Sequence, residues 1–558
     1  MRHFHLVVLL ALSAVLSGCL SLPDTGGVQP GVDAAPADDG LDLVAADPAQ
    51  DASQEEIVRG FLFAAAAGLA DDFETARRFL TNTGGQEWDP GDGVTIYADA
   101  DALSYRSHLD DPRLVTVTAQ VAATVDAQGT FTEAAPGTVR EFTFELEQSS
   151  DDQWRINTLD DGVLVSWVTF GSQYRQMSVY FLSTDAAHRL IPEVRWVPRS
   201  GSENAAVRGL LAGPAQWLAG GAVTAVPDGT NLALDAVTIA DGIATVALSR
   251  QILDASAADR ALVLEQLTAT LVQLPQIRLV QMSVDGSVLG VDEDAGLVPV
   301  PIPARNPTLV SGAGLSVLNG EALEPVPDLV VPEGLTALAL RYTDELPVGV
   351  VGPQLVTLAG SGEPNPVLYQ GDGEILPPTI DVQGWVWTGP RSPEPIPGSL
   401  VAIGPDGDQV QVQAPHLADL EVVDIRVSLE GARLAYVVRG ELDTLFVSSV
   451  ERNPDGQPVA IGPGVAVGAP MAQVLDLVWV NDVELGVLGA LEEVVTVHLV
   501  GVGGATVPLP SIDNAVSIAS GDGPRQLYLT TVDGELFGRS GNGWRVVVGG
   551  VQLPTFAG

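Results

Sequence analysis

The second half of the chain contains short apolar runs, typical of β-strands, that recur at a nearly constant interval. The clearest group predicts three successive strands at 423–429, 434–438 and 444–450. Similar groups begin near residues 335, 380, 475 and 516, so that successive starts lie about 41–52 residues apart. This interval is typical of the four-stranded blades of a β-propeller. We therefore predict that residues 309–558 form an all-β region, a β-propeller of five or six blades.

The two ends of this region predict how the propeller closes. A strand around Leu315–Leu318 precedes the first complete group, so the closing blade is expected to combine strands from both ends. Asp406-Gly407 and Asp533-Gly534 have the composition of tight hairpin turns. A pair of β-sandwiches is the structural alternative. A propeller presents a central funnel and flat faces suited to binding, and its fold alone implies no reaction.

Residues 53–172 change from a helical period to a strand period. Ser53 and Glu56 have the spacing of a capping box, and the apolar residues that follow share one helix face. Asp71-Asp72 predicts the cap of a second helix. Alternation predicts antiparallel strands at 115–121 and 142–146, continued by 154–156 and 163–168. This α+β domain looks like a nuclear-transport-factor-like cone, a fold that encloses a cavity in many relatives.

Three carboxylate pairs of this domain have the residue type that acid–base catalysis uses. They are Asp110-Asp111, Asp151-Asp152 and Asp160-Asp161. Each pair stands between predicted strands, where aspartate side chains supply local hydrogen bonds to turns. We interpret all three as turns and caps.

Residues 178–296 predict a further α+β domain. Strands are expected at 179–182, from 190, at 243–249 and at 279–284, with helices near 204–211 and from 256. Gly213-Pro214 ends the first of these helices and Pro275 ends the second. The fold class is therefore multidomain, two α+β domains followed by an all-β propeller.

Five pieces of this region resemble the GerMN domain, first known from sporulation and germination proteins. They are Leu211-Ala212-Gly213-Pro214, Val226-Pro227-Asp228-Gly229-Thr230, Asp241-Gly242-Ile243-Ala244-Thr245-Val246, Thr270-Leu271 and Val284-Asp285-Gly286. The resemblance implies a GerMN fold over residues 178–296 and brings no catalytic centre with it. The matching residues are turn and core types, which maintenance of the fold explains without a site.

Leu16-Ser17-Gly18-Cys19 ends a short apolar run near the start of the chain. The run begins at Leu6 and holds about 11 residues, too few for a membrane-spanning helix and typical of a signal peptide. Cys19 is the only cysteine, so it has no partner for an intrachain disulfide. The pattern resembles the lipobox of bacterial lipoproteins, in which the cysteine receives a diacylglyceryl group. We predict a lipoprotein signal peptide at 1–18 and lipidation of Cys19; an ordinary secretory signal is the alternative.

Two or more acyl chains hold a protein firmly to a membrane. Residues 19–52 are rich in Pro, Gly, Ala and Asp, and we interpret them as a disordered tether. Everything after Cys19 is therefore expected at the outer face of the cytoplasmic membrane, held by the lipid anchor.

The charge balance limits the possible partners. The chain has 71 acidic and 26 basic residues, a formal net charge of −45, and contains no lysine. Such a surface repels polyphosphates, which argues against a nucleic-acid partner. It would steer basic partners, although a solvated acidic surface without any partner is our preferred interpretation.

A lipobox, an N-terminal α+β domain, a GerMN domain and a propeller occur in this order in the LpqB lipoproteins of actinobacteria, which the chain resembles. The resemblance implies a non-catalytic protein that binds the extracellular domain of the sensor histidine kinase MtrB. It also implies modulation of that two-component pathway, with effects on the cell envelope and division.

Two alternatives remain open. A cell-wall glycan-binding or envelope-scaffold protein would be favoured by exposed aromatic residues on one propeller face, such as Trp385, Trp387 and Trp544. An enzyme in the propeller funnel would need several polar groups that converge at the axis, and the sequence shows no such constellation. We therefore predict no enzymatic activity and no catalytic residue.

No cofactor and no metal are predicted either. The four histidines after the signal region lie in different parts of the chain: His108, His188, His416 and His498. Asp292-Glu293-Asp294 lacks the rest of a calcium loop, and we interpret it as an acidic linker.

Overall fold

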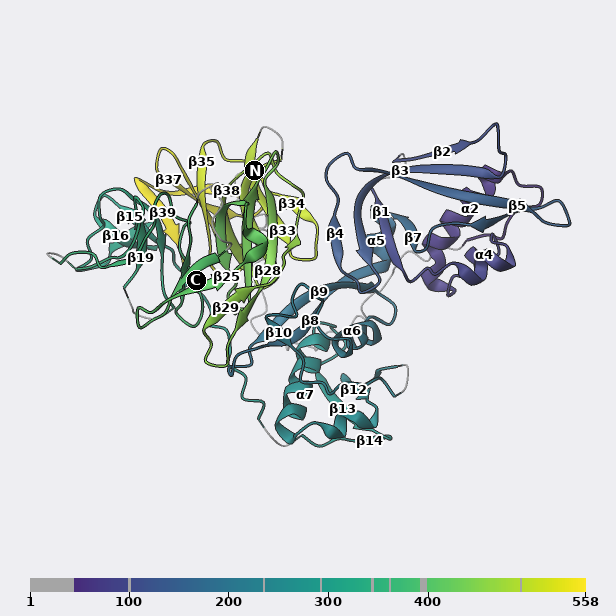
Figure 1. Ribbon diagram of the computed structural model, residues 1–558, viewed down its shortest axis with the longest axis horizontal. Coiled ribbons are helices and arrows are strands. Elements are labelled where there is room, and N and C mark those ends of the chain that lie inside the picture. Colours follow the sequence, from purple (N-terminus) through teal and green to yellow (C-terminus); the bar gives the residue numbers. More distant parts are fainter. Residues whose placement is uncertain are drawn as a thin grey trace, which may run out of the picture. The chain divides into compact units, whose positions relative to one another are not determined.

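The computed structural model describes residues 45–557 apart from 99–101, 234–235, 292–293, 343–345, 361–362, 392–398 and 492–493. By their contacts, residues 43–558 form one compact unit, in which three folded regions follow one another along the chain (Figure 1). None of the helices in these ranges combines the length and the hydropathy needed to cross a bilayer. The predicted signal peptide, Cys19 and most of the predicted tether lie outside the described residues.

The N-terminal domain packs helices against a mainly antiparallel sheet (Figure 1). Its helices are α2 (Gln54–Ala67), η1 (Gly68–Ala70), α3 (Glu74–Arg77), α4 (Asn82–Glu87) and α5 (Trp167–Gln173). Its strands are β1 (Gly93–Tyr97), β2 (Leu103–Ser107), β3 (Leu114–Asp126), β4 (Phe131–Glu133), β5 (Val139–Gln148), β6 (Trp154–Thr158) and β7 (Val163–Ser166). The main path runs β6-β5-β3-β1-β7, and only β1 and β7 pair in parallel. Phe61 of α2 meets Phe144 of β5 edge to face at 6.1 Å in the domain core.

The predicted capping box is present at the start of α2. Ser53 Oγ accepts from the Glu56 main-chain N–H, and the Glu56 carboxylate accepts from the Ser53 N–H. Two details of the sequence prediction are wrong. Phe73 takes a left-handed conformation with φ 61°, so the second helix is only the four-residue α3. The last strand ends at Ser166, because its hydroxyl caps α5 by accepting from Thr169 N–H.

The GerMN region holds two sheets and two α-helices, and each helix connects two strands of one sheet. Its elements are β8 (Tyr174–Ser183), β9 (Leu190–Pro198), α6 (Ser202–Leu211), β10 (Ala222–Val223), β11 (Thr238–Ala240), β12 (Ile243–Ala247), η3 (Arg250–Asp254), α7 (Ala257–Leu271), β13 (Leu279–Val284) and β14 (Ser287–Val288). The sheet orders are β10-β8-β9 and β11-β12-β13-β14. Both predicted helices are confirmed. Their inner faces are buried at Leu210 of α6 and Leu267 of α7, and Ser256 caps α7.

The remaining strands form the propeller, with six blades of four strands within the described residues; the parallel pairing of Gln413 with Ala460 joins two neighbouring blades into one continuous sheet. The first five blades start with β18 (Leu335–Ala339), β22 (Thr379–Ile380), β26 (Glu421–Val427), β31 (Gln473–Asn481) and β35 (Ala515–Ser520). The blade that starts with β18 continues through β19 (Val348–Val351), β20 (Gln354–Thr357) and β21 (Val367–Gln370), and the blade that starts with β22 through β23 (Val386–Thr388), β24 (Ser399–Ile403) and β25 (Gln409–Gln413). The blade that starts with β26 continues through β27 (Arg433–Arg439), β28 (Thr444–Arg452) and β29 (Pro458–Ile461), and the blade that starts with β31 through β32 (Glu484–Ala490), β33 (Val495–Gly501) and β34 (Thr506–Pro508). The blade that starts with β35 continues through β36 (Leu527–Thr531), β37 (Glu535–Ser540) and β38 (Gly543–Gly549). A short extra strand, β30 (Val465–Ala466), pairs with β28, and η4 (Pro415–Leu417) follows β25.

The closing blade joins both ends of the propeller region, as predicted. It consists of β15 (Thr308–Ser311), β16 (Gly314–Asn319), β17 (Ala322–Pro325) and β39 (Val551–Thr555). β39 pairs antiparallel with β15, and Leu309 and Val551 are fully buried there. The predicted Asp-Gly turns are also confirmed, because Gly407 and Gly534 have φ values of 87° and 76°, which glycine adopts without strain.

Candidate functional site

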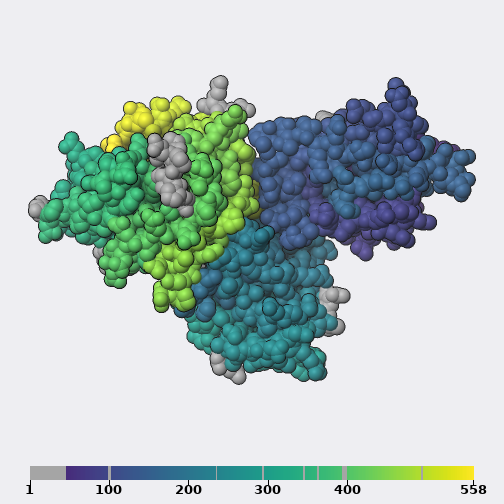
Figure 2. Space-filling model, in the orientation of Figure 1, coloured from purple at the N-terminus to yellow at the C-terminus, as the bar shows by residue number. Residues whose placement is uncertain are grey.

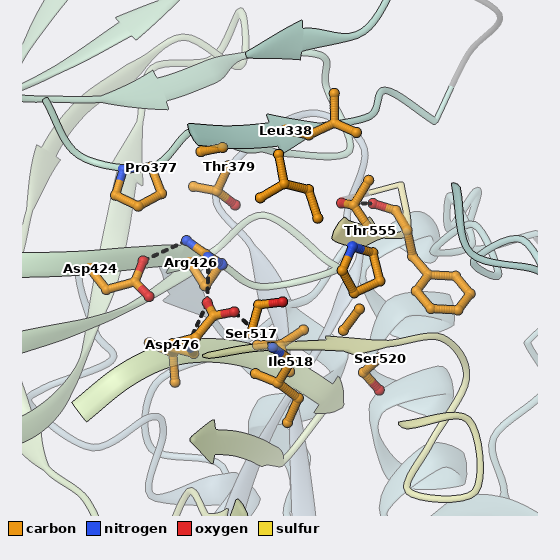
Figure 3. Close-up of a pocket in the computed structure, with 18 of the residues that line it drawn as sticks. Leu338, Pro377, Thr379, Asp424, Arg426, Asp476, Ser517, Ile518, Ser520 and Thr555 are labelled. Atoms are coloured by element: carbon orange, nitrogen blue, oxygen red, sulfur yellow. Dashed lines mark hydrogen bonds and ion pairs between the residues drawn. The ribbon is translucent and has the colours of Figure 1, made fainter. Parts of the chain in front are cut away.

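A cavity of about 500 Å³ lies at the propeller axis (Figure 3). Its walls include residues of β18, β22, β26, β31 and β35, the edge strands that begin five blades. β39, the edge strand of the closing blade, supplies the rest of the ring. Because each of the six blades contributes an edge strand, this cavity is the central funnel of the propeller.

Three charged side chains meet in the funnel. Arg426 Nη1 donates to Asp424 Oδ1 at 2.5 Å, and Arg426 Nη2 donates to Asp476 Oδ1 at 3.0 Å (Figure 3). Asp476 Oδ2 also accepts from the Ile518 main-chain N–H at 2.9 Å, so β26, β31 and β35 are connected through this group. The Asp424 side chain is 7% exposed and the Arg426 side chain 20% exposed, so the group lies mostly out of water.

We call Asp424, Arg426 and Asp476 the triad, and burial has the largest effect on the pKa values of its two carboxyls. It raises the pKa of the Asp424 carboxyl to about 7, because the ionised form loses water, and Arg426 offsets only part of the rise. Burial raises the pKa of Asp476 as well, again against the effect of Arg426. Asp424 Oδ1 accepts from Arg426 and from the Ile425 N–H, whereas no donor among the described residues reaches Asp424 Oδ2.

The sequence shows no constellation of polar groups at the axis, whereas the structure brings these three charged side chains together there. Asp424 and Arg426 stand two residues apart and interrupt the apolar pattern of a predicted strand. This interruption is the sequence feature that could have indicated a charged group at the axis. Asp476 lies in another blade, so its approach depends on how the propeller closes. These three side chains give the funnel charged groups that can bind a ligand or move a proton.

A second set of buried charges lies where the GerMN domain meets the propeller. Arg433 is fully buried, pairs with Glu430 at 2.7 Å and donates to the Pro192 carbonyl oxygen of β9 at 3.3 Å. Gln383 of the propeller donates to Asp185 of the GerMN domain. In Figure 2 the teal GerMN surface adjoins the green surface of the propeller, as these hydrogen bonds require. We call this set of contacts the GerMN–propeller joint.

The joint extends into the propeller through further buried groups. Arg452 pairs with Asp381 at 2.6 Å and donates to Gln383 at 2.6 Å. Trp387 Nε1 donates to the same Asp381 carboxylate at 3.0 Å. Trp387 is fully buried, and Trp385 and Trp544 are partly buried, so these three residues do not supply the exposed aromatic face that would favour the glycan-binding alternative.

The N-terminal domain has a separate cavity of about 310 Å³. Phe61, Phe142 and Phe144 line its apolar part, and Arg140 and the Asp160-Asp161 pair line its polar part.

The three carboxylate pairs lie in turns, as predicted. Asp111 accepts from the Arg113 N–H, Asp151 accepts from Ser149 Oγ, and Asp161 accepts from the Asp89 N–H. Each of these bonds holds a local turn or joins two loops.

The histidines stay apart and form no common site. His108 contacts Thr116 Oγ1 at 2.9 Å, and burial lowers the pKa of His416 and of His498. Within the described part of the chain, no group of three or more His, Cys, Asp or Glu side chains is arranged to hold a metal ion. Asp292 and Glu293 of the predicted acidic linker lie outside that part, as does Cys19.

Comparison with known families matches three consecutive regions. Residues 47–171 match the N-terminal domain of lipoprotein LpqB, residues 178–290 match a family described as sporulation and spore germination, and residues 312–557 match the LpqB β-propeller domain. Among solved structures, the tandem GerMN domains of GerM from Bacillus subtilis are 21% identical, with a TM-score of 0.18, over 23% of this chain and 42% of that chain. The Cps50 (Swd1) β-propeller domain is 8% identical, with a TM-score of 0.28, over 39% of this chain and 72% of that chain.

Two relatives that match most of the chain are both named lipoprotein LpqB. Lipoprotein LpqB of Streptomyces coelicolor is 30% identical over 533 residues, which cover 85% of this chain and 84% of the relative. Lipoprotein LpqB of Cutibacterium acnes is 27% identical over 527 residues, 88% of this chain and 87% of the relative. The chain therefore belongs to the LpqB lipoprotein family.

Proposed function

We propose that this chain is a lipid-anchored binding protein at the outer face of the cytoplasmic membrane. Its partner is the extracellular domain of an MtrB-like sensor histidine kinase, and binding modulates the two-component pathway and cell-envelope homeostasis. Relatives over most of the chain are named lipoproteins and not enzymes, which supports a non-catalytic role. The lipobox-like residues Leu16-Ser17-Gly18-Cys19 support the anchor.

The GerMN–propeller joint is the observation that carries the binding role. Breaking a buried hydrogen bond is costly when it leaves a polar group out of water without a partner. The hydrogen bonds of Arg433 with the Pro192 carbonyl oxygen and of Gln383 with Asp185 cross between the two domains, and they therefore resist separation of the two domains. Domains held together in this way offer a protein partner a composite surface of fixed geometry, which reduces the entropy cost of binding.

If the acidic surface serves a partner, the contact surface of that partner is basic. A net charge of −45 speeds the encounter with a basic domain and makes the association rate sensitive to salt. The proposal therefore includes a kinase extracellular domain whose contact surface is basic.

Calorimetric titration tests the binding role. The mature chain, from residue 19 onward, is titrated with the purified extracellular domain of the kinase at low and at high salt. We expect a dissociation constant of about micromolar or tighter that weakens as salt rises. Gly221→Ala, which disturbs the joint, should weaken binding, whereas Gly290→Ala, an open-space control, should not. Absence of binding at both salt concentrations contradicts the proposal, and capture by purified peptidoglycan alone favours the glycan-binding alternative.

Metabolic labelling tests the anchor separately. Cells that express the wild-type chain or Cys19→Ser are fed an alkyne-tagged palmitate analogue and then fractionated. We expect label and membrane association for the wild type, and loss of both for Cys19→Ser. A wild-type chain that is unlabelled and freely secreted contradicts the anchor and leaves the binding test unaffected.

A further inference from the structure

One arginine of the funnel wall has no counter-charge in contact with it. Arg391, which follows β23, and Arg426 are the two guanidiniums among the described residues that line the cavity. Arg426 is already committed, because its Nη1 donates to Asp424 and its Nη2 to Asp476. In the described part of the chain, the Arg391 main-chain N–H donates to the Glu374 carbonyl oxygen, and its guanidinium makes no ion pair. Arg391 is therefore the cation of the funnel that is available to a ligand.

The charges on the wall cancel only when both carboxyls are ionised. The charged groups among the described lining residues are Asp424, Asp476, Arg426 and Arg391. Burial raises the pKa of both carboxyls, that of Asp424 to about 7, and Arg391 acts on Asp424 through space in the opposite direction. Both guanidiniums stay protonated. When Asp424 takes up a proton, these four groups together carry at least one net positive charge.

Hydroxyl groups on the wall have hydrogen-bonding capacity left. A hydroxyl group can donate one hydrogen bond and accept two. Thr379 Oγ1 accepts from the Val427 N–H, and no hydrogen bond within the described residues uses its own hydrogen. Thr336 and Thr555 each donate to a main-chain carbonyl oxygen, so their oxygens can still accept. Thr379 and Thr555 lie beside the same space as the triad (Figure 3).

The size and the lining of the funnel together suit a small polar ligand. A volume of about 500 Å³ is in the range of small-molecule sites. The threonine hydroxyls can bond to hydroxyl groups of a ligand, and an unpaired guanidinium is suited to a carboxylate, with which it can form two parallel hydrogen bonds.

We propose that the propeller funnel binds a small hydroxylated carboxylate, such as a sugar acid, whose carboxylate pairs with Arg391 while its hydroxyl groups bond to the threonines of the wall. The ligand anion and an ionised Asp424 repel each other, so binding favours the protonated form of Asp424. A neutral polyol lacks the ion pair, and an amine with the same body is repelled by Arg391. This site is independent of kinase binding, because it uses none of the residues of the GerMN–propeller joint.

The test compares three probes with one six-carbon polyol body: gluconate, glucitol and 1-amino-1-deoxyglucitol. Each is titrated into the mature chain at pH 6 and at pH 8, with calorimetry and ligand-observed NMR as readouts. We expect gluconate to bind, glucitol to bind more weakly and the amine not to bind. With a pKa of about 7, Asp424 is protonated in about nine-tenths of the molecules at pH 6 and in about one-tenth at pH 8, so gluconate binding should weaken about tenfold between them.

Two variants separate the ion pair from the fold. Arg391→Gln should weaken gluconate binding at pH 6 about ten- to a hundredfold, since charge-assisted hydrogen bonds contribute that much. Arg545→Gln, the same change at an exposed arginine, should leave it unchanged. Asp424→Asn stays uncharged, so it should bind gluconate at pH 8 about as tightly as the wild type does at pH 6, a gain that a folding defect cannot produce. Equal binding of gluconate and glucitol, preference for the amine, no binding of gluconate to the wild type at pH 6, or unchanged binding in Arg391→Gln each overturns the proposal.

Discussion

Arg433 Nη1 of the propeller lies 3.3 Å from the carbonyl oxygen of Pro192 in the GerMN domain, to which it donates a hydrogen bond. The same guanidinium donates to the Asp482 carbonyl oxygen at 2.6 Å and pairs with Glu430 at 2.7 Å. Burial alone would raise the pKa of Glu430, but Arg433 more than offsets this effect, and the pKa is lowered. One arginine thus keeps a buried carboxylate ionised and joins two domains.

Arg433→Met should therefore destabilise the protein strongly. Glu430, with 2% of its side chain exposed, would remain buried without its counter-charge, which costs about 3–5 kcal/mol. Calorimetry should show the propeller transition roughly 10 °C lower. Arg545→Ala removes an exposed pair with Glu321 and should change stability by less than about 1 kcal/mol. Equal effects of the two substitutions would contradict the importance of the buried pair.

Gly221→Ala should loosen the joint by steric conflict. A Cβ at Gly221 would lie 2.7 Å from the Ala432 carbonyl oxygen and 2.9 Å from that of Val450, and main-chain atoms cannot move aside cheaply. Overpacking of this kind costs about 1–3 kcal/mol. Limited proteolysis should cleave between the GerMN domain and the propeller faster in this variant. Gly290→Ala meets no atom within 4 Å and should behave like the wild type.

Deletion of residues 551–558 should open the propeller. It removes β39, exposes the β15 edge and uncovers Leu309, which is fully buried in the native chain. A free strand edge beside exposed apolar side chains promotes association. Size-exclusion chromatography should show oligomers or aggregates, whereas deletion of Gly558 alone should leave a monodisperse protein. A monodisperse deletion variant with an unchanged melting temperature would show that β39 is dispensable.

Features set by neighbouring residues were predictable from the sequence. The Ser53–Glu56 capping box, the Ser256 cap and the Asp-Gly turns depend on residues within one helical turn or hairpin. The spacing of the strand groups predicted the propeller and its closing blade, because each blade repeats one architecture.

Features that depend on register or on distant segments were not predictable. Arg433 and Pro192 are 241 residues apart, and their hydrogen bond follows from how two domains pack. Asp424 and Asp476 meet only after bulges shift two ladders by one residue. The burial of Trp387 was not predictable either, because a strand pattern alone does not say which face of a blade packs against its neighbour.

The raised pKa of Asp424 makes stability depend on pH in a definite direction. The carboxyl titrates near 7 in the native chain and near 4 in an unfolded chain. Between these values the native chain binds more protons than the unfolded chain, so the free energy of unfolding falls as pH rises. The contribution of this group is fully present below about pH 4 and is lost as pH rises through about 7.

Asp424→Asn removes this group and should remove its share of the pH dependence. Melting temperatures of the wild type and the variant are compared from pH 5 to pH 8. The variant should gain stability relative to the wild type as pH rises, because only the wild type has to ionise a buried carboxyl. Asp476 also has a raised pKa and repels Asp424, so the difference between the two curves reports the titration of this pair in the wild type against Asp476 alone in the variant. A difference that stays constant across this range would mean that Asp424 is already ionised at pH 5.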